Sequence, residues 1–183
     1  MIISFIGPSG SGKGTQANLF SKKGFSVISG GNILREEYDK KTEFGIKMHD
    51  DYWGKGLWVP DEIISSLVLS AVDFNQENIL FDAFPRTYGQ VLILDKFLKD
   101  NDKDLFKIFE FSLPKNKALK RLKKRKDNRE DDKSLDIISN RFDSYDKNID
   151  SIRSFYFDKL VLIDASNSIE TIFNLINGYL YET

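Results

Sequence analysis

The N-terminal segment constrains the fold more than any other part of the chain. An apolar stretch at residues 2–6 runs directly into the turn Gly-Pro-Ser-Gly-Ser-Gly-Lys-Gly-Thr at residues 7–15, and residues 16–20 continue as the first turns of an expected helix. A buried strand, a glycine-rich turn and a helix in this order are typical of an α/β fold. A flexible connection between strand and helix is the alternative, and the joint occurrence of glycines, lysine and helix in register argues against it.

The turn has the chemistry of a phosphate-binding loop. Glycines allow torsions that point successive N–H groups inward, and the helix start adds unpaired N–H groups and a favourable dipole. Lys13 would reach the outer phosphates of a nucleotide. Thr15 would supply the hydroxyl that helps to hold Mg²⁺, because Gly14 occupies the position directly after the lysine. The predicted loop residues are Gly10, Ser11, Gly12, Lys13, Gly14 and Thr15.

Short segments rich in Val, Ile, Leu and Phe alternate along the chain with segments of three-to-four-residue periodicity. This alternation predicts an α/β fold with a parallel sheet and helices on both faces. Ligands of such sheets bind at the carboxyl ends of the strands, and Lys13 and Asp82 both lie just past such an end. The expected strands are residues 2–6, 26–28, 79–81, 106–113 and 160–163.

Composition excludes several function classes. The chain has 183 residues, of which 40% are hydrophobic and 30% charged, so we expect a single domain over residues 1–183. It has no cysteine and a single histidine, His49, which excludes disulfides and thiolate catalysis and argues against histidine-rich metal sites. The formal net charge of −1 gives no global attraction to nucleic acid or anionic membranes. No stretch approaches the roughly 18–20 apolar residues of a membrane span, and no signal-peptide layout is present, so a cytoplasmic protein is expected.

A second chemical element follows the expected strand at residues 79–81. Asp82 is placed where a carboxylate at a strand end can orient Mg²⁺, often through water. Arg86 follows a proline that fixes the turn, so its guanidinium can be presented to a phosphate with little loss of entropy. Taken alone, Asp82 could cap a helix and Arg86 could be a surface residue, but their occurrence together with the first loop favours the functional interpretation.

Further motifs occur in an order that points to one family. They are Gly-Lys-Gly-Thr-Gln at 12–16, Ile-Ser-Gly-Gly-Asn-Ile-Leu-Arg at 28–35, Val-Pro-Asp-Glu at 59–62, Asp-Ala-Phe-Pro-Arg-Thr at 82–87 with Gln90, and Arg-Glu-Asp-Asp at 129–132 with Arg141. In these motifs, which cover nearly the whole chain, the sequence resembles the adenylate kinase family of nucleoside monophosphate kinases.

The resemblance implies a P-loop NTPase-type core, a monophosphate-binding helical flap at about residues 30–62 and a very short lid at about residues 126–133. It implies reversible transfer of the γ-phosphoryl group of Mg-ATP to a nucleoside monophosphate, with Mg²⁺ as cofactor. The short lid has no room for the long lid, with or without zinc, of some relatives, so no zinc is expected. Closure would keep water from acting as the acceptor. The implied partners are ATP and a nucleoside monophosphate, without nucleic acid or membrane, and a monomer is expected.

The resemblance also assigns roles to individual residues. Besides the phosphate loop, the residues implied for ATP are Arg121 beside the adenine, Arg125, and, as a weaker match, Asn167 in the loop 165–167. Those implied for the monophosphate are Gly30, Arg35, Leu57, Trp58, Val59, Ala83, Arg86, Gln90, Arg129 and Arg141. The implied catalytic residues are Lys13, Arg86, Arg125, Arg129 and Arg141, and the implied metal-binding residues are Asp82 and Thr15. In this scheme Arg35 and Arg86 hold the acceptor phosphate, and Gln90 reads the acceptor base through its amide.

The basic segment at residues 117–129 also allows interpretations without a nucleotide site. Its lysines and arginines cover every side of a helix, so their density fits a solvated face or a nucleic-acid patch as well as a nucleotide site. Only Arg121 and Arg125, one turn apart on one face, match the family, and the neighbouring lysines are expected to face solvent.

The departures from the family pattern cluster where the acceptor base should bind. Gly30 stands where adenylate kinases usually have threonine, Ala83 replaces a usual glycine, and Trp58 replaces a smaller aliphatic residue. The motif at residues 84–87 with Gln90 still favours AMP. A UMP/CMP-type pyrimidine monophosphate kinase remains the alternative, because that branch also has a small residue at the position of Gly30 and a short lid.

Two other classes remain as alternatives. A nucleotide-binding regulatory protein with weak turnover would need the phosphate loop, but it would not need arginines converging from several segments. A GTPase-like switch is disfavoured because no Asn-Lys-x-Asp guanine-reading motif is present.

Overall fold

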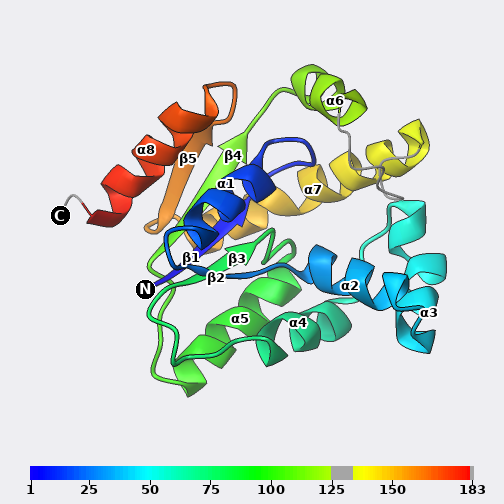
Figure 1. The fold of residues 1–183 in the computed structure, drawn as a ribbon, viewed down its shortest axis with the longest axis horizontal. Helices are drawn as coiled ribbons and strands as arrows, with labels where there is room; N and C mark the ends of the chain where they lie inside the picture. The colour runs from blue at the N-terminus through cyan, green and yellow to red at the C-terminus, as the bar shows by residue number, and fades with distance from the viewer. Residues whose placement is uncertain (125–133, 182–183) are drawn as a thin grey trace.

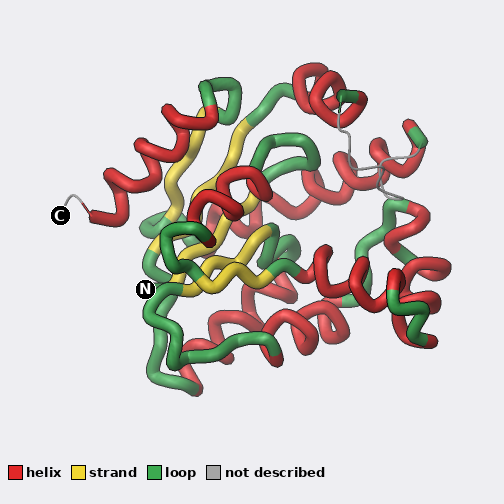
Figure 2. The backbone as a smooth tube through the Cα atoms, viewed as in Figure 1, coloured by secondary structure: helices red, strands yellow, loops and turns green. Residues whose placement is uncertain are grey.

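The protein folds around a five-stranded parallel sheet, seen in a computed structural model that describes residues 1–124 and 134–181. The strand order is β2-β3-β1-β4-β5, and the sheet runs through the middle of the molecule between layers of helices (Figure 2). The strands are β1 (Ile2–Ile6), β2 (Ser26–Ile28), β3 (Ile79–Asp82), β4 (Lys107–Ser112) and β5 (Leu160–Asp164). The expected α/β fold with a parallel sheet is confirmed.

The strand boundaries differ slightly from the expected ones. Asp82 pairs with Phe5 and so extends β3, and Asp164 pairs with Ser112 and extends β5. The β4 strand is shorter by one residue at each end than expected. The strands therefore extend into polar residues, which an apolar sequence pattern does not include.

The helices cover both faces of the sheet (Figure 1). They are α1 (Lys13–Ser21), α2 (Gly30–Asp39), α3 (Glu43–Asp51), the 3₁₀ helix η1 (Trp53–Lys55), α4 (Asp61–Ser70), α5 (Tyr88–Asp100), α6 (Lys115–Lys123), α7 (Leu135–Phe155) and α8 (Ile169–Tyr181). One core cluster joins the sheet to α1 and α8, and another joins its other face to α4, α5 and the second half of α7. The α2–α3 pair projects from the core on the side away from α8 (Figure 1).

Aromatic packing fixes the central strand against its neighbours. Phe5 on β1 is fully buried, and its ring meets Phe20 of α1 edge-on with the ring centroids 5.7 Å apart. It also meets Phe109 of β4 at 5.9 Å and Phe111 at 5.2 Å. The loop that follows β1 therefore starts from an immobile part of the core.

None of the helices within residues 1–124 and 134–181 combines the length and the apolar composition that crossing a membrane requires.

Candidate active site

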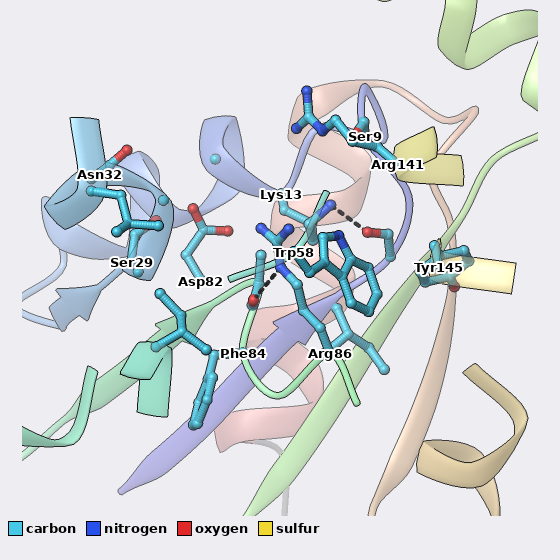
Figure 3. A pocket seen from close by; sticks show the side chains of 18 of the residues that line it. Ser9, Lys13, Ser29, Asn32, Trp58, Asp82, Phe84, Arg86, Arg141 and Tyr145 are labelled. Atoms are coloured by element: carbon cyan, nitrogen blue, oxygen red, sulfur yellow. Dashed lines mark hydrogen bonds between the residues drawn. The ribbon is translucent and has the colours of Figure 1, made fainter. Parts of the chain in front are cut away.

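One large cavity opens at the carboxyl ends of the central strands. Its volume is about 530 Å³, and it extends from the phosphate loop to α2, the end of β3 and α7. Figure 3 shows Lys13, Asp82, Trp58, Arg86 and Arg141 around this cavity. The sheet topology thus brings together side chains from widely separated parts of the sequence.

The phosphate loop has the backbone that its glycines predict. Gly7, Gly10 and Gly12 have φ values of 141°, 80° and 95°, which side chains rarely tolerate. At Gly7 a Cβ would also lie 2.6 Å from the carbonyl oxygen of Phe111. Lys13 begins α1, and its Nζ donates to the carbonyl oxygens of Gly7 at 2.7 Å and Pro8 at 2.9 Å. The ammonium group is therefore held over the loop, at the edge of the cavity.

The residues expected to hold Mg²⁺ fit that role. Asp82 Oδ1 is buried and has no hydrogen-bond partner among residues 1–124 and 134–181, which is costly for a carboxylate oxygen unless a ligand completes it. Asp82 Oδ2 would lie only 3.9 Å from a Cβ on Gly14, so the carboxylate sits beside the loop, and exposed Thr15 lines the same cavity. No cluster of three or more His, Cys, Asp or Glu side chains occurs among the described residues. Sparse protein ligation is normal for Mg²⁺, which takes other ligands from water and substrate phosphates.

The arginines expected on the acceptor side come from different elements. Arg86 follows β3, and its Nε donates to the carbonyl oxygen of Ala83 at 2.8 Å. Its guanidinium carbon lies 5.8 Å from the centroid of the Trp58 ring, a cation–π arrangement. Arg35 on α2 donates to Asn32 Oδ1 at 2.7 Å, and Arg141 enters the cavity from α7. The structure brings all three arginines to one cavity.

The substituted positions have clear structural contexts. A Cβ on Gly30 would lie 2.7 Å from Ile64 Cδ1 and 3.0 Å from Val68 Cγ2, so α4 side chains fill the space of the absent threonine. Ala83 has a φ of 60°, in the left-handed region that favours glycine. Trp58 is half-buried, and its buried Nε1 finds no hydrogen-bond partner in the described part of the chain. Leu57 and Val59, expected beside the acceptor, also line the cavity.

Gln90 is 2% exposed and lines the cavity, but its amide also bonds within the protein. Its Nε2 donates to Asp61 Oδ1 at 2.8 Å, and its Oε1 accepts from the backbone N–H of Arg86 at 2.8 Å. Asp61 belongs to the Val-Pro-Asp-Glu motif at residues 59–62, which gives it no role by itself. Its partner lies 29 residues further along the chain, so only the fold reveals the contact.

The residues expected beside the donor adenine lie outside the large cavity. Arg121 on α6 donates to the carbonyl oxygen of Ala165 at 2.8 Å, so it contacts the loop after β5. Asn167 in that loop donates from Nδ2 to the carbonyl oxygen of Asp164 at 3.0 Å. Arg125, Arg129 and the expected lid, residues 126–133, lie outside the described residues.

Tyr145 is a cavity residue that the sequence analysis does not identify. Its hydroxyl donates to Oε1 of the fully buried Glu110 at 2.8 Å, and Arg153 donates to the same carboxylate. Burial raises the pKa of the Tyr145 hydroxyl well above its ordinary value, and the negative charge of Glu110 adds to the rise. Tyr145 therefore stays protonated at neutral pH and acts as a donor.

A parallel sheet with a phosphate loop after its first strand, and a basic cavity at the strand ends, defines a protein of the P-loop NTPase type. The family model described as "Adenylate kinase" matches residues 5–161. An adenylate kinase of Azobacteroides pseudotrichonymphae is 36% identical over 182 residues, covering 95% of this chain and 94% of the relative. An adenylate kinase of Parabacteroides distasonis is 34% identical over 180 residues, with the same coverage of both chains. An adenylate kinase of Pyrococcus abyssi is 29% identical over 212 residues, covering 98% of this chain and 96% of the relative.

The chain belongs to the adenylate kinase family. It is accordingly a nucleotide-binding phosphotransferase, a nucleoside monophosphate kinase. The family and enzyme class expected from the sequence motifs are confirmed.

Proposed function

We propose that this enzyme transfers the γ-phosphoryl group of Mg-ATP reversibly to AMP, giving two molecules of ADP. One observation carries the proposal: the phosphate-loop lysine and the arginines of the acceptor side border the same cavity. A donor phosphate bound at Lys13 and an acceptor phosphate bound at Arg86 would therefore meet without an intermediate carrier. The names of the relatives support AMP as the acceptor.

In the proposed reaction the protein positions two nucleotides and neutralises charge. Phosphoryl transfer needs little covalent chemistry from the enzyme, because most of the acceleration comes from alignment and electrostatic stabilisation. Lys13 and the loop N–H groups would bind the donor phosphates, and Arg35 and Arg86 would bind the acceptor phosphate. Arg125, Arg129 and Arg141 would surround the transferred group.

Asp82 and Thr15 would hold Mg²⁺, in part through water. When bound, the ion neutralises the donor phosphates and orients them. The unpartnered Oδ1 of Asp82 supports this assignment.

The pyrimidine monophosphates CMP and UMP are the second candidates for the acceptor. The absence of a threonine at Gly30 motivates that candidate. Ile64 and Val68 already fill the vacated space, so the glycine does not enlarge the base site in the direction of α4. This packing favours retention of an adenine site.

We further propose that residues 1–183 form one kinase domain, with a monophosphate-binding flap at about residues 30–62 and a short lid at about residues 126–133. We propose that it acts as a cytoplasmic monomer and binds neither zinc, nucleic acid nor membranes.

The test is ADP formation from Mg-ATP with AMP, CMP, UMP, GMP or dTMP at equal concentrations, beside an acceptor-free reaction. AMP should give the highest kcat/KM. The Lys13→Met variant, checked for an unchanged circular dichroism spectrum, should lose at least about a hundredfold in transfer, because a charge that stabilises the transition state is removed.

Each alternative outcome would contradict a different part of the proposal. A preference for CMP or UMP would assign the enzyme to the pyrimidine branch and leave the phosphate chemistry intact. Turnover without dependence on any acceptor would contradict the kinase assignment and favour a nucleotide-binding regulatory protein. Normal transfer by the Lys13→Met variant would contradict the role of the phosphate loop.

A further inference from the structure

A carboxylate on the first turn of α4 is seated against the N-terminus of α5. Asp61 Oδ2 accepts a hydrogen bond from the Thr87 hydroxyl at 2.6 Å, and Asp61 Oδ1 accepts one from Gln90 Nε2 at 2.8 Å. A Cβ on Gly89 would lie only 2.4 Å from Asp61 Oδ2, so the glycine permits this close approach. Both oxygens of the carboxylate therefore have specific donors on α5 or its N-cap.

The Gln90 amide is held at both ends. The backbone N–H of Arg86 donates to Gln90 Oε1 at 2.8 Å, opposite the bond from Nε2 to Asp61. An ionised carboxylate can only accept hydrogen bonds, and a backbone N–H can only donate. A half-turn of the amide would place the Gln90 N–H₂ group against the Arg86 N–H, and the Gln90 oxygen against the Asp61 carboxylate. The side chain is 2% exposed, so water could not relieve these clashes, and one amide orientation is enforced.

The enforced orientation limits which bases the amide can recognise. A primary amide has two N–H donors and two acceptor lone pairs, of which the contacts with Asp61 and Arg86 use one each. Gln90 lines the large cavity, so the remaining donor and acceptor are the ones a bound base can meet. Adenine and cytosine present an amino donor next to an unprotonated ring nitrogen. Hypoxanthine, guanine and uracil present a carbonyl oxygen next to a ring N–H, which is the reverse pattern.

We propose that Asp61 is a positioning residue that makes the acceptor site select amino bases over oxo bases by holding the Gln90 amide in one orientation. The inference rests on the proposed function in one respect, namely that Gln90 faces the acceptor base. An amide that cannot turn matches the amino pattern and opposes the reverse pattern, since a buried donor would then face a donor. Without the carboxylate, only the bond to Arg86 opposes rotation, so the turned amide, which fits the reverse pattern, becomes less costly than in the wild type.

AMP and inosine monophosphate form the matched acceptor pair, because they differ only in this donor and acceptor order at the purine edge. The Asp61→Ala variant should lower the ratio of kcat/KM for AMP to kcat/KM for inosine monophosphate by about tenfold or more, through the acceptor KM. Asp61→Asn keeps an acceptor oxygen for Gln90 and should retain most of the ratio. Glu62→Gln removes a charge from the same first turn of α4 on an exposed side chain and should leave the ratio unchanged.

The outcomes separate this inference from the proposed function. Equal loss of kcat/KM for both acceptors in folded Asp61→Ala would show a purely structural role and overturn the inference. A wild-type ratio near one would also overturn it. Isothermal calorimetry of both acceptors with the wild type and with Asp61→Ala measures the same selectivity as a ratio of dissociation constants, without turnover. If the protein shows no transfer but its binding selectivity depends on Asp61, the proposed function alone is refuted. If neither acceptor binds, the proposed function and this inference are both refuted. If the acceptor panel favours CMP, CMP and UMP replace the purine pair.

Discussion

At the residue scale, Ala83 shows how a single backbone conformation shapes the site. Its N–H donates to the carbonyl oxygen of Phe5 at 2.8 Å, and its own carbonyl oxygen accepts from Arg86 Nε, so neighbouring contacts hold it at a φ of 60°. This left-handed conformation costs an alanine about 1 kcal/mol more than a glycine. Strain at this position is therefore linked directly to the orientation of Arg86.

We expect Ala83→Gly to raise the free energy of unfolding by about 0.5–1 kcal/mol, because relief of the backbone strain outweighs the entropy of the added glycine. Urea denaturation followed by circular dichroism measures the change. Ala71→Gly is the matched control. Ala71 caps α4 with an ordinary φ of −86°, so a glycine there relieves no strain and should lower the free energy of unfolding. If Ala83→Gly lowers the free energy of unfolding as much as Ala71→Gly does, Ala83 is not strained.

At the element scale, an ion pair between the buried carboxylate of Glu110 and the half-exposed guanidinium of Arg153 joins β4 to α7. Arg153 Nη2 lies 2.6 Å from Glu110 Oε1, and Arg153 Nε lies 2.9 Å from Glu110 Oε2, a bidentate contact with a carboxylate that is 0% exposed. The hydrogen bond to Glu110 raises the pKa of the Arg153 guanidinium, so this guanidinium stays charged. Because α7 also carries Arg141, this pair helps to fix the helix that brings that arginine to the cavity.

Arg153→Met should lower the free energy of unfolding by about 1–3 kcal/mol, because among the described residues it leaves the buried Glu110 carboxylate with only the Tyr145 hydroxyl as a side-chain donor. The double variant Glu110→Leu/Arg153→Met should recover most of the loss. Asp150→Ala breaks only the exposed pair between Arg153 and Asp150 and should cost less than about 1 kcal/mol. Denaturant titration of the variants measures these differences, and equal losses in Arg153→Met and Asp150→Ala would contradict the stabilising role of the Glu110–Arg153 contact.

At the scale of the whole molecule, the buried Tyr156 and the half-buried Tyr145 make stability depend on alkaline pH. Burial raises the pKa of Tyr156, with a smaller contribution from the charges of Asp95 and Asp104, and burial also raises the pKa of Tyr145. Above pH about 10 the unfolded chain loses these phenol protons while the folded protein keeps them. The stabilising contribution is thus complete below pH 10 and is lost as the pH rises.

The free energy of unfolding should fall above pH 10 by up to about 1.4 kcal/mol per pH unit for each tyrosine. Tyr156→Phe should reduce this slope, and it should change stability little at neutral pH because the Tyr156 hydroxyl has no hydrogen-bond partner. Urea titrations between pH 8 and 11 measure the slope, with Tyr179→Phe as an exposed control. Identical slopes for the wild type and Tyr156→Phe would exclude the buried phenol as a cause.

Much of the architecture is predictable from the sequence, because local patterns encode local structure. Apolar runs predict the strands, and the glycines with Lys13 predict the loop after β1 and its torsions. Asp82 and Arg86 are found because strand ends in a parallel sheet share one edge. The strand order and the division of the helices between the two faces do not follow from these patterns, since they depend on how whole elements pack.

The sequence by itself determined the class of fold, the phosphate loop, the family and the residue types available for phosphoryl transfer. Each of these is written in short segments or in their order along the chain. Only the tertiary structure decided that Asp61 holds Gln90, that Ile64 fills the space beside Gly30, and that Arg153 neutralises Glu110. The physical reason is that each contact joins residues from different elements, and its geometry depends on packing that no single segment encodes.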